Sequence, residues 1–203
     1  MKILMLCLLM GIRFIDVETG HHWIRVCAEG DSNTNAGFPG GTWVNQIADL
    51  LDTASEYSVL NRGESGKKVY TMVQNGAINV DAYYMAGHTN ICLLLGGYND
   101  TGTGTSQDST YTLIKEFCND RRAAGWYMII MTYPNSQLSE TNDSIQANWT
   151  TFADDMIDLA EAPYIGEAAD HSDTTYYRDI VHMSIAGFGI VADSVYKHLE
   201  ALR

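Results

Sequence analysis

Ser32 is the first residue of the chain whose type and setting could do chemistry. It follows Gly30-Asp31 at the end of an apolar run and precedes a stretch of small polar residues. A turn of this composition between a strand and a helix suits a nucleophile, a phosphate ligand or a helix cap, so all three roles are open. A serine hydroxyl becomes a good nucleophile only when a base takes its proton. A catalytic Ser32 therefore requires a histidine, and usually an acid that orients it.

His182 is the best candidate base among the six histidines. Asp179 stands three residues before it, and in a helical turn such a pair shares one face, with the carboxylate on one imidazole nitrogen. Pairs of this spacing also serve as simple helix caps, so the pair alone is a weak signal. His171 competes because acids flank it in Asp-His-Ser-Asp. The other four precede a predicted strand or lie late in the last predicted helix: His21, His22, His88 and His198.

The elements that must position these residues follow an alternating pattern. Short apolar runs that end at Gly, Asn or Pro are typical of strands buried on both faces, and they occupy 23–28, 57–60, 90–97 and 126–133. A fifth strand is expected at 164–168. Apolar stripes with helical spacing occupy 43–51, 113–118 and 188–202. This alternation predicts a three-layer α/β/α fold, with a doubly wound, flavodoxin-like parallel sheet of about five strands.

Ligands of open parallel sheets bind beyond the carboxyl ends of the strands, near the switch in strand order. Three polar, glycine-containing turns follow the first three predicted strands, at 30–32, 61–66 and 96–100. We expect these turns to converge on one edge of the sheet. The biased segment 101–110 is expected to be a loop.

The four segments together resemble the GDSL-type, or SGNH, hydrolase family, whose four motifs carry Ser, Gly, Asn and His in this chain order. The resemblance spans residues 24 to about 202. The matching residues are Gly30-Asp31-Ser32 with Thr34, Asn61-x-Gly63-x-x-Gly66, Gly97-x-Asn99-Asp100 and Asp179-x-x-His182. One such motif arises often by chance, whereas four in order do not.

The resemblance implies a role for each site residue. Ser32 would be the nucleophile, His182 the general base and then the acid, and Asp179 the group that orients the imidazole. The oxyanion hole would consist of the backbone N–H groups of Ser32 and Gly63 and the side-chain amide of Asn99. Fixed donors of this kind stabilise the negative charge of a tetrahedral intermediate.

Two acids within these motifs are not expected to be catalytic. Asp31 and Asp100 are expected to stabilise their own turns through hydrogen bonds to the backbone. No cluster of His, Cys and carboxylates has metal spacing, and no cofactor is expected.

The implied function is a serine esterase that hydrolyses carboxylic esters of short acyl chains, acetylated sugars among them. Segments 101–110 and 167–178 are expected to line the cleft, and their small, polar and tyrosine residues favour a polar or sugar-like alcohol. One alternative is a flavodoxin-like, FMN-binding electron carrier, because Ser-Asn-Thr-Asn-Ala-Gly at 32–37 resembles a hydroxyl-rich phosphate loop. Another is a carbohydrate-binding relative without catalysis.

Composition narrows the choice of partners. The 203 residues are 46% hydrophobic, which is enough for one core without disulfides or metal. Because 12 Lys and Arg stand against 25 Asp and Glu, the net charge of -13 disfavours nucleic acid and anionic membranes as partners. A small-molecule or carbohydrate ester suits this charge better. The cysteines show no CxxC spacing and are expected to be core residues: Cys7, Cys27, Cys92 and Cys118.

Residues 1–20 are expected to be an N-terminal extension that precedes one hydrolase domain at 21–203. The extension has the basic start and short apolar core of a secretory signal, but Arg13 interrupts it and no clear cleavage site follows. It is too short to span a bilayer. The pattern fits a cytoplasmic and a secreted protein equally, and the sequence makes no prediction of oligomeric state.

Overall fold

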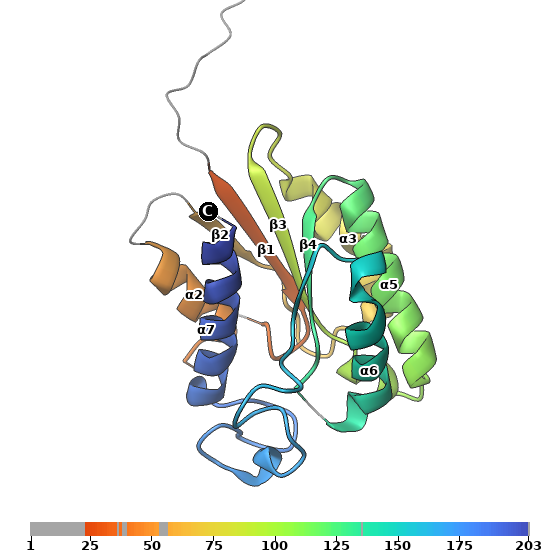
Figure 1. Cartoon of the computed structure of the whole chain (residues 1–203), viewed down its shortest axis with the longest axis vertical. Helices are drawn as coiled ribbons and strands as arrows, with labels where there is room; N and C mark the ends of the chain where they lie inside the picture. The colour runs from red at the N-terminus through yellow and green to blue at the C-terminus, as the bar shows by residue number, and fades with distance from the viewer. Residues whose placement is uncertain (1–22, 36, 38–39, 53–56, 135, 203) are drawn as a thin grey trace, which may run out of the picture.

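A five-stranded parallel sheet forms the centre of the structure, a computed structural model that describes residues 23–35, 37, 40–52, 57–134 and 136–202. The strand order is β2-β1-β3-β4-β5, and Figure 1 shows helices on both faces, which confirms the predicted fold class. The predicted extension at 1–20, with Cys7, and the histidines at 21 and 22 lie outside the described residues. The strands are β1 (Ile24–Gly30), β2 (Tyr57–Asn61), β3 (Thr89–Leu95), β4 (Tyr127–Met131) and β5 (Asp155–Ile157).

Four of the predicted strands exist, and the fifth prediction is wrong. Residues 164–168 form a turn, closed by a hydrogen bond from the Gly166 N–H to the Ala162 carbonyl at 2.9 Å. Tyr164 in this turn has a φ of 71°, which no extended strand has. The fifth strand is instead the three-residue β5 at the sheet edge, which is too short to show a period.

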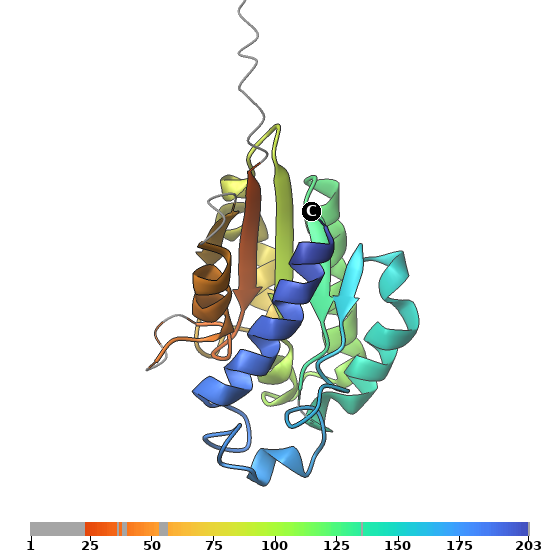
Figure 2. The same cartoon turned by 60° about the vertical axis from the view of Figure 1, so that its left-hand side comes forward.

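The helices divide between the two faces of the sheet. Helices α2 and α7 cover one face, and α3, α5 and α6 cover the other (Figures 1 and 2). Each face has its own buried cluster, because the central strands send apolar side chains to both sides. The α-helices are α2 (Trp43–Asp52), α3 (Val69–Asn79), α4 (Tyr98–Thr101), α5 (Gln107–Ala123), α6 (Ser139–Asn148) and α7 (Ile185–Ala201). Short 3₁₀ turns are η1 (Asp81–Tyr83), η2 (Ser136–Leu138), η3 (Trp149–Thr151) and η4 (Asp170–Ser172).

The segment 101–110 is only partly a loop, which corrects the prediction. Helix α5 begins at Gln107, and the Ser106 hydroxyl accepts a hydrogen bond from the Ser109 N–H at 3.2 Å as its N-cap. The prediction of a loop rested on the serine and threonine content of this segment, but Ser106 instead caps the start of a helix. Three of the cysteines are buried and free, as expected of core residues: Cys27, Cys92 and Cys118.

The strand order sets the place of the site. The order reverses between β1 and β3, because β2 lies on one side of β1 while β3, β4 and β5 follow on the other. The last paired residues of β1 and β3 are Gly30 and Leu95, so the loops after them leave from the same point of the sheet edge. In Figure 2 the strands run downward, and the segment between β5 and α7 lies below their carboxyl ends.

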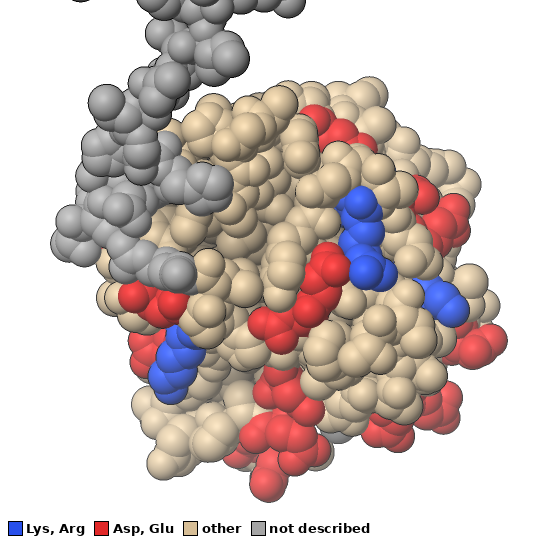
Figure 3. Space-filling model, turned by 45° about the horizontal axis from the view of Figure 1, so that its top comes forward, with Lys and Arg blue, Asp and Glu red and all other residues tan. Residues whose placement is uncertain are grey.

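The surface carries many acidic side chains and few basic ones on the face seen in Figure 3. This distribution agrees with the net charge of -13. Within the described residues, every helix is too short or too polar to cross a membrane.

Candidate active site

Ser32, His182 and Asp179 lie in hydrogen-bond contact at the carboxyl edge of the sheet. The Ser32 Oγ lies 3.0 Å from the His182 Nε2, although 150 residues separate them in the chain. The His182 Nδ1 lies 2.8 Å from the Asp179 Oδ2 and 3.1 Å from its Oδ1. These contacts can pass a proton from the hydroxyl to the imidazole while the carboxylate fixes the ring's tautomer.

The segment that carries the acid and the base is a tight loop and not the helical turn expected from the spacing. Tyr177 and Met183 form an antiparallel bridge, and Asp179 and His182 lie within the loop that this bridge closes. The Asp179 Oδ1 accepts hydrogen bonds from the N–H groups of Val181 and His182, each at 2.8 Å. The carboxylate therefore shapes the turn and also holds the imidazole.

These contacts set the protonation of Asp179. Burial alone raises its pKa, but the hydrogen bonds from the His182 N–H, the His182 ring and the Val181 N–H outweigh burial, and the pKa lies below the ordinary aspartate value. Asp179 is thus a carboxylate at neutral pH, which is the form that accepts an N–H from the imidazole.

Asn33 joins the serine turn to the histidine loop, and sequence reasoning missed it. Its side chain is fully buried, and its Nδ2 donates to the Val181 carbonyl at 3.1 Å while its Oδ1 accepts from the Met183 N–H at 3.2 Å. The Nδ2 also donates to the Tyr133 hydroxyl at 2.7 Å. One amide therefore holds the main chain on both sides of His182. No local pattern distinguishes this asparagine from its polar neighbours in the sequence.

Asp31 and Asp100 brace main-chain turns, as expected. The Asp31 Oδ1 accepts from the Asn33 N–H at 3.0 Å, and the Asp100 Oδ2 accepts from the Val69 N–H, the first of helix α3, at 2.8 Å. Asp31 is fully buried, and burial raises its pKa to about 6, although the Asn33 N–H and the nearby His182 lower it. Burial likewise raises the pKa of Asp100.

The predicted oxyanion donors differ in whether they already donate a hydrogen bond within the described structure. The Ser32 N–H has no hydrogen-bond partner within the described part of the chain. The Gly63 N–H donates to the Asn61 Oδ1 at 2.9 Å, so it braces its own loop. A Cβ at Gly63 would lie 2.6 Å from the Thr34 carbonyl carbon, which explains why the position needs a glycine. In the same loop, Gly66 has a φ of 76° and an N–H without a partner among the described residues.

Asn99 is held by the main chain of Lys67, whose side chain forms a buried ion pair that sequence reasoning also missed. Its Nδ2 donates to the Lys67 carbonyl at 3.0 Å, which leaves the second amide hydrogen for another acceptor. The Lys67 Nζ lies 2.8 Å from the Glu29 Oε1, and both side chains are buried. That same oxygen accepts from the Gly30 N–H at 3.0 Å. Burial raises the pKa of Glu29, and the adjacent Lys67 lowers it.

The other described histidines lie elsewhere. The His171 ring packs 4.8 Å from the Tyr177 ring, and its Nε2 is buried without a partner. The His198 Nδ1 lies 2.6 Å from the Asp155 Oδ2, which links α7 to the edge strand β5. His88 precedes β3 at the opposite end of the sheet. Among the described residues, no three His, Cys, Asp or Glu side chains are grouped to hold a metal ion.

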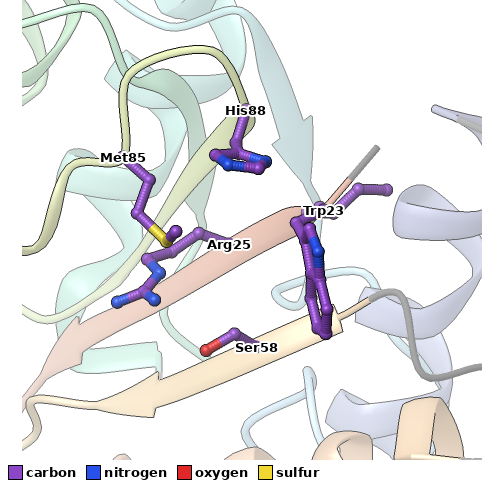
Figure 4. A pocket seen from close by; sticks show the side chains of 6 residues that line it. Trp23, Arg25, Ser58, Met85 and His88 are labelled. Carbon is purple, nitrogen blue, oxygen red and sulfur yellow. The ribbon is translucent and has the colours of Figure 1, made fainter. Parts of the chain in front are cut away.

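A hollow of about 380 Å³ lies at the amino ends of β1 and β2, far along the sheet from Ser32. Figure 4 shows Arg25 and Ser58 on neighbouring strands, with Trp23 and His88 beside them. Its position opposite the carboxyl edge separates it from the Ser32 and His182 pair. The lining residues are Trp23, Ile24, Arg25, Ser58, Met85 and His88.

The fold and the site together define an α/β protein with a hydroxyl, an imidazole and a carboxylate in series at its sheet edge. Solved structures with this fold include an acetylxylan esterase from Geobacillus stearothermophilus (TM-score 0.68, 19% identity, 85% of this chain and 92% of that chain). A GDSL-like lipase from Bacteroides thetaiotaomicron matches with a TM-score of 0.69 at 18% identity, over 88% of this chain and 89% of that chain. The acetyl xylan esterase AlAXEase matches with a TM-score of 0.69 at 20% identity, over 86% and 98%.

These neighbours have the fold that the four motifs led us to expect, that of GDSL-type hydrolases, and at such identities the similarity establishes the shared fold. No match to the sequence was found among protein-family models or among curated proteins. The neighbours named here are esterases and a lipase, so the flavin-binding alternative gains no support from them. Asn33 and Thr34 of the supposed phosphate loop are also fully buried, which turns their side chains away from an open anion site.

Proposed function

We propose that this chain is a serine esterase of the GDSL type, with Ser32 as nucleophile, His182 as general base and Asp179 as the orienting acid. The observation that carries the proposal is the continuous contact from the Ser32 Oγ to the His182 Nε2 at 3.0 Å and from the Nδ1 to Asp179 at 2.8 Å. A base within about 2.6–3.2 Å of the hydroxyl satisfies the geometric requirement for proton abstraction.

In the proposed reaction the Ser32 Oγ attacks the ester carbonyl carbon and its proton moves to the His182 Nε2. The tetrahedral intermediate collapses when the C–O bond to the alcohol breaks, and the leaving oxygen takes the proton from the Nε2. The acyl group then remains on Ser32. Water attacks this acyl-enzyme with His182 again as base, and the acid is released with the free serine.

The oxyanion would accept hydrogen bonds from the Ser32 N–H, the Gly63 N–H and the second hydrogen of the Asn99 amide. The freedom of the Ser32 N–H and the fixed position of the Asn99 amide support these roles. The Gly63 N–H can serve only if it shares or leaves its bond to Asn61, and the Gly66 N–H in the same loop, which has no partner among the described residues, is an alternative donor. Each such donor typically contributes ~2.7–4 kcal/mol to lowering the barrier.

The proposed substrates are neutral esters of short acyl chains, acetylated sugars among them, and the reaction needs no cofactor. The acidic surface disfavours anionic alcohols, and two of the structural neighbours act on acetylated xylan by name. Nitrophenyl esters of increasing chain length, measured beside acetylated xylo-oligosaccharides, test the proposal. We expect the highest kcat/KM for acetyl esters. Absence of hydrolysis for every ester, in a folded preparation, would contradict it.

A further inference from the structure

Tyr164 has an unusual backbone for an exposed tyrosine. Its φ is 71°, and no other non-glycine residue among those described has a positive φ. The left-handed region strains a residue with a Cβ, and such strain persists where function retains it. The side chain is 60% exposed, so burial in the core does not compensate for the strain. The feature therefore suggests a functional role for the ring.

The Tyr164 ring is held in a fixed stack. Its centroid lies 5.1 Å from that of Tyr176, and the two planes differ by 18°. The next residue of each segment is locked into the core, because the buried Tyr177 hydroxyl lies 2.6 Å from the carbonyl of the buried Ile165. The same hydroxyl lies 2.7 Å from the Pro134 carbonyl. The turn that carries Tyr164 and the loop that carries Tyr176 are thus fixed against each other.

Tyr176 belongs to the same face of its loop as the proposed base. Tyr177 and Met183 are bridged partners that both point into the core. Tyr176 and His182 each precede one of these partners, and alternation at the bridge places both on its other side, where both are half-buried and the Tyr176 ring also packs against the core. The Ser184 N–H donates to the Tyr176 carbonyl at 2.8 Å, which keeps the two arms of the loop together. Tyr176 is therefore opposite Ser184, two residues from His182, and at ~3.3 Å per residue it lies roughly 7 Å along the ladder from the level of His182.

The setting of the stack is polar and acidic. The turn that carries Tyr164 also lines a pocket of about 300 Å³, where Glu161 and Glu167 face Ser139, Asn142, Asp143 and Gln146 across from it. Carboxylates and amides suit a ligand rich in hydroxyl groups and repel an anionic one. An exposed aromatic face, in turn, suits the C–H face of a sugar ring, because the face of the π-system is electron-rich.

We propose that Tyr164 and Tyr176 form a stacking platform for a neutral pyranose ring in the alcohol part of the substrate. The proposal rests on the esterase function and narrows its substrate class to sugar esters longer than a lone acetylated monosaccharide. The platform lies beside the reacting atoms and not at them, so it acts on substrate binding. It should therefore change KM and leave kcat nearly unaltered.

The experiment compares three acetyl esters: acetylated xylo-oligosaccharides, glycerol triacetate, which has no ring, and 4-nitrophenyl acetate, which has an aryl ring. For Tyr164→Ala we expect a KM about tenfold higher on the xylo-oligosaccharides and an unchanged KM on glycerol triacetate. Tyr164→Trp, which keeps an aromatic face, should retain most of the affinity. Tyr84→Ala is the matched control, since Tyr84 is also exposed and paired with an aromatic ring but lies before β3, at the far end of the sheet.

Tyr164→Gly separates function from stability. Glycine adopts a φ of 71° without strain, so this variant should unfold at the same or a higher temperature while it loses the sugar affinity. A variant that loses both would indicate a structural tyrosine and overturn the proposal.

A direct binding measurement tests the stacking platform independently of catalysis. Unacetylated xylotriose is titrated into Ser32→Ala and into the double variant that also carries Tyr164→Ala, and calorimetry should detect about tenfold weaker binding in the double variant. Equal binding in both, or an equal loss on glycerol triacetate or 4-nitrophenyl acetate, would overturn the platform. If no ester is hydrolysed but the Tyr164-dependent binding persists, the esterase proposal fails and the sugar platform stands.

Discussion

Asn33 and His182 are joined through the main chain on both sides of the imidazole. The Asn33 amide donates to the carbonyl of the residue before His182 and accepts from the N–H of the residue after it, at 3.1 and 3.2 Å. Since Asn33 is also the neighbour of Ser32, one buried side chain sets the distance between nucleophile and base. Asn33 is a positioning residue, because it acts through His182 and does not reach the reacting atoms.

Asn33→Asp tests this relationship. A carboxylate cannot donate to the Val181 carbonyl, so the histidine loop should shift, and displacements of about 1 Å can cost on the order of 10²-fold in rate. We expect kcat to fall at least tenfold with little change in KM, together with a loss of about 1–3 kcal/mol in unfolding free energy. Asn35→Asp is the control, since the side-chain hydrogen bonds of Asn35 to Ser65 and Gly37 are exposed. Wild-type kcat in Asn33→Asp would contradict the positioning role.

The buried Asp31 should make stability depend on pH. Burial raises its pKa from the ordinary 3.8 to about 6, so the folded chain binds this proton more tightly than the unfolded chain. The contribution of Asp31 to stability is then fully present below about pH 4 and is lost as the pH rises through about 6. Relative to Asp31→Asn, the wild type should lose on the order of 3 kcal/mol of unfolding free energy between pH 4 and pH 7. Urea titrations across this range measure the difference, and a difference that does not vary with pH would refute the assignment.

The buried pair of Lys67 and Glu29 should respond asymmetrically to substitution. Lys67→Met leaves a buried carboxylate without its partner, which typically costs ~3–5 kcal/mol. Adding Glu29→Gln removes the charge while keeping an acceptor for the Gly30 N–H, so the double variant should recover part of the loss. Lys68→Met, one position on, should stay within about 0.5 kcal/mol of wild type. The denaturant midpoints of the three variants measure these differences in stability. A double variant less stable than Lys67→Met would contradict the ion pair between Lys67 and Glu29.

The two histidines with acidic neighbours should differ sharply in their effect on activity. His182→Ala removes the only imidazole within 3.0 Å of Ser32 in the described structure, so we expect a loss of at least 10³-fold in kcat. His171→Ala removes a ring that packs on Tyr177, and we expect a small loss of stability with kcat within threefold. Equal losses of kcat in the two variants would reopen the choice of base.

Long, apolar elements were the predictable part of this fold. The central strands β1, β3 and β4 are mostly apolar, and α7 carries a clear apolar stripe, so the periodicity identified them. The edge strand β5 has three residues and begins with Asp155, which gives no period to detect. Helix α6 is mostly polar and packs through few buried residues, so its pattern is weak. The order of the four motifs then led to Ser32 and His182.

Long-range polar contacts were the part that the sequence could not predict. The Asn33 amide bonds to a main-chain segment about 150 residues away, and no local sequence pattern indicates these hydrogen bonds. The pairing of Lys67 with Glu29 crosses from the second loop to the first strand and becomes evident only when both are buried. The Asp179 turn was expected as a helical turn because i, i+3 spacing fits both conformations, and only the bridge closing the loop separates them.

Covalent labelling of Ser32 is the most direct test of the central claim. A nitrophenyl alkylphosphonate transfers its phosphorus to an activated serine and mimics the tetrahedral intermediate. We predict one equivalent of phosphonate per chain on the peptide that contains Ser32, loss of ester hydrolysis in step with labelling, and no labelling of Ser32→Ala or His182→Ala. Ser65→Ala, which removes the serine of the loop after β2, should label at nearly the wild-type rate. Labelling at a different residue, or a fully active Ser32→Ala, would contradict the assignment of Ser32 as the nucleophile.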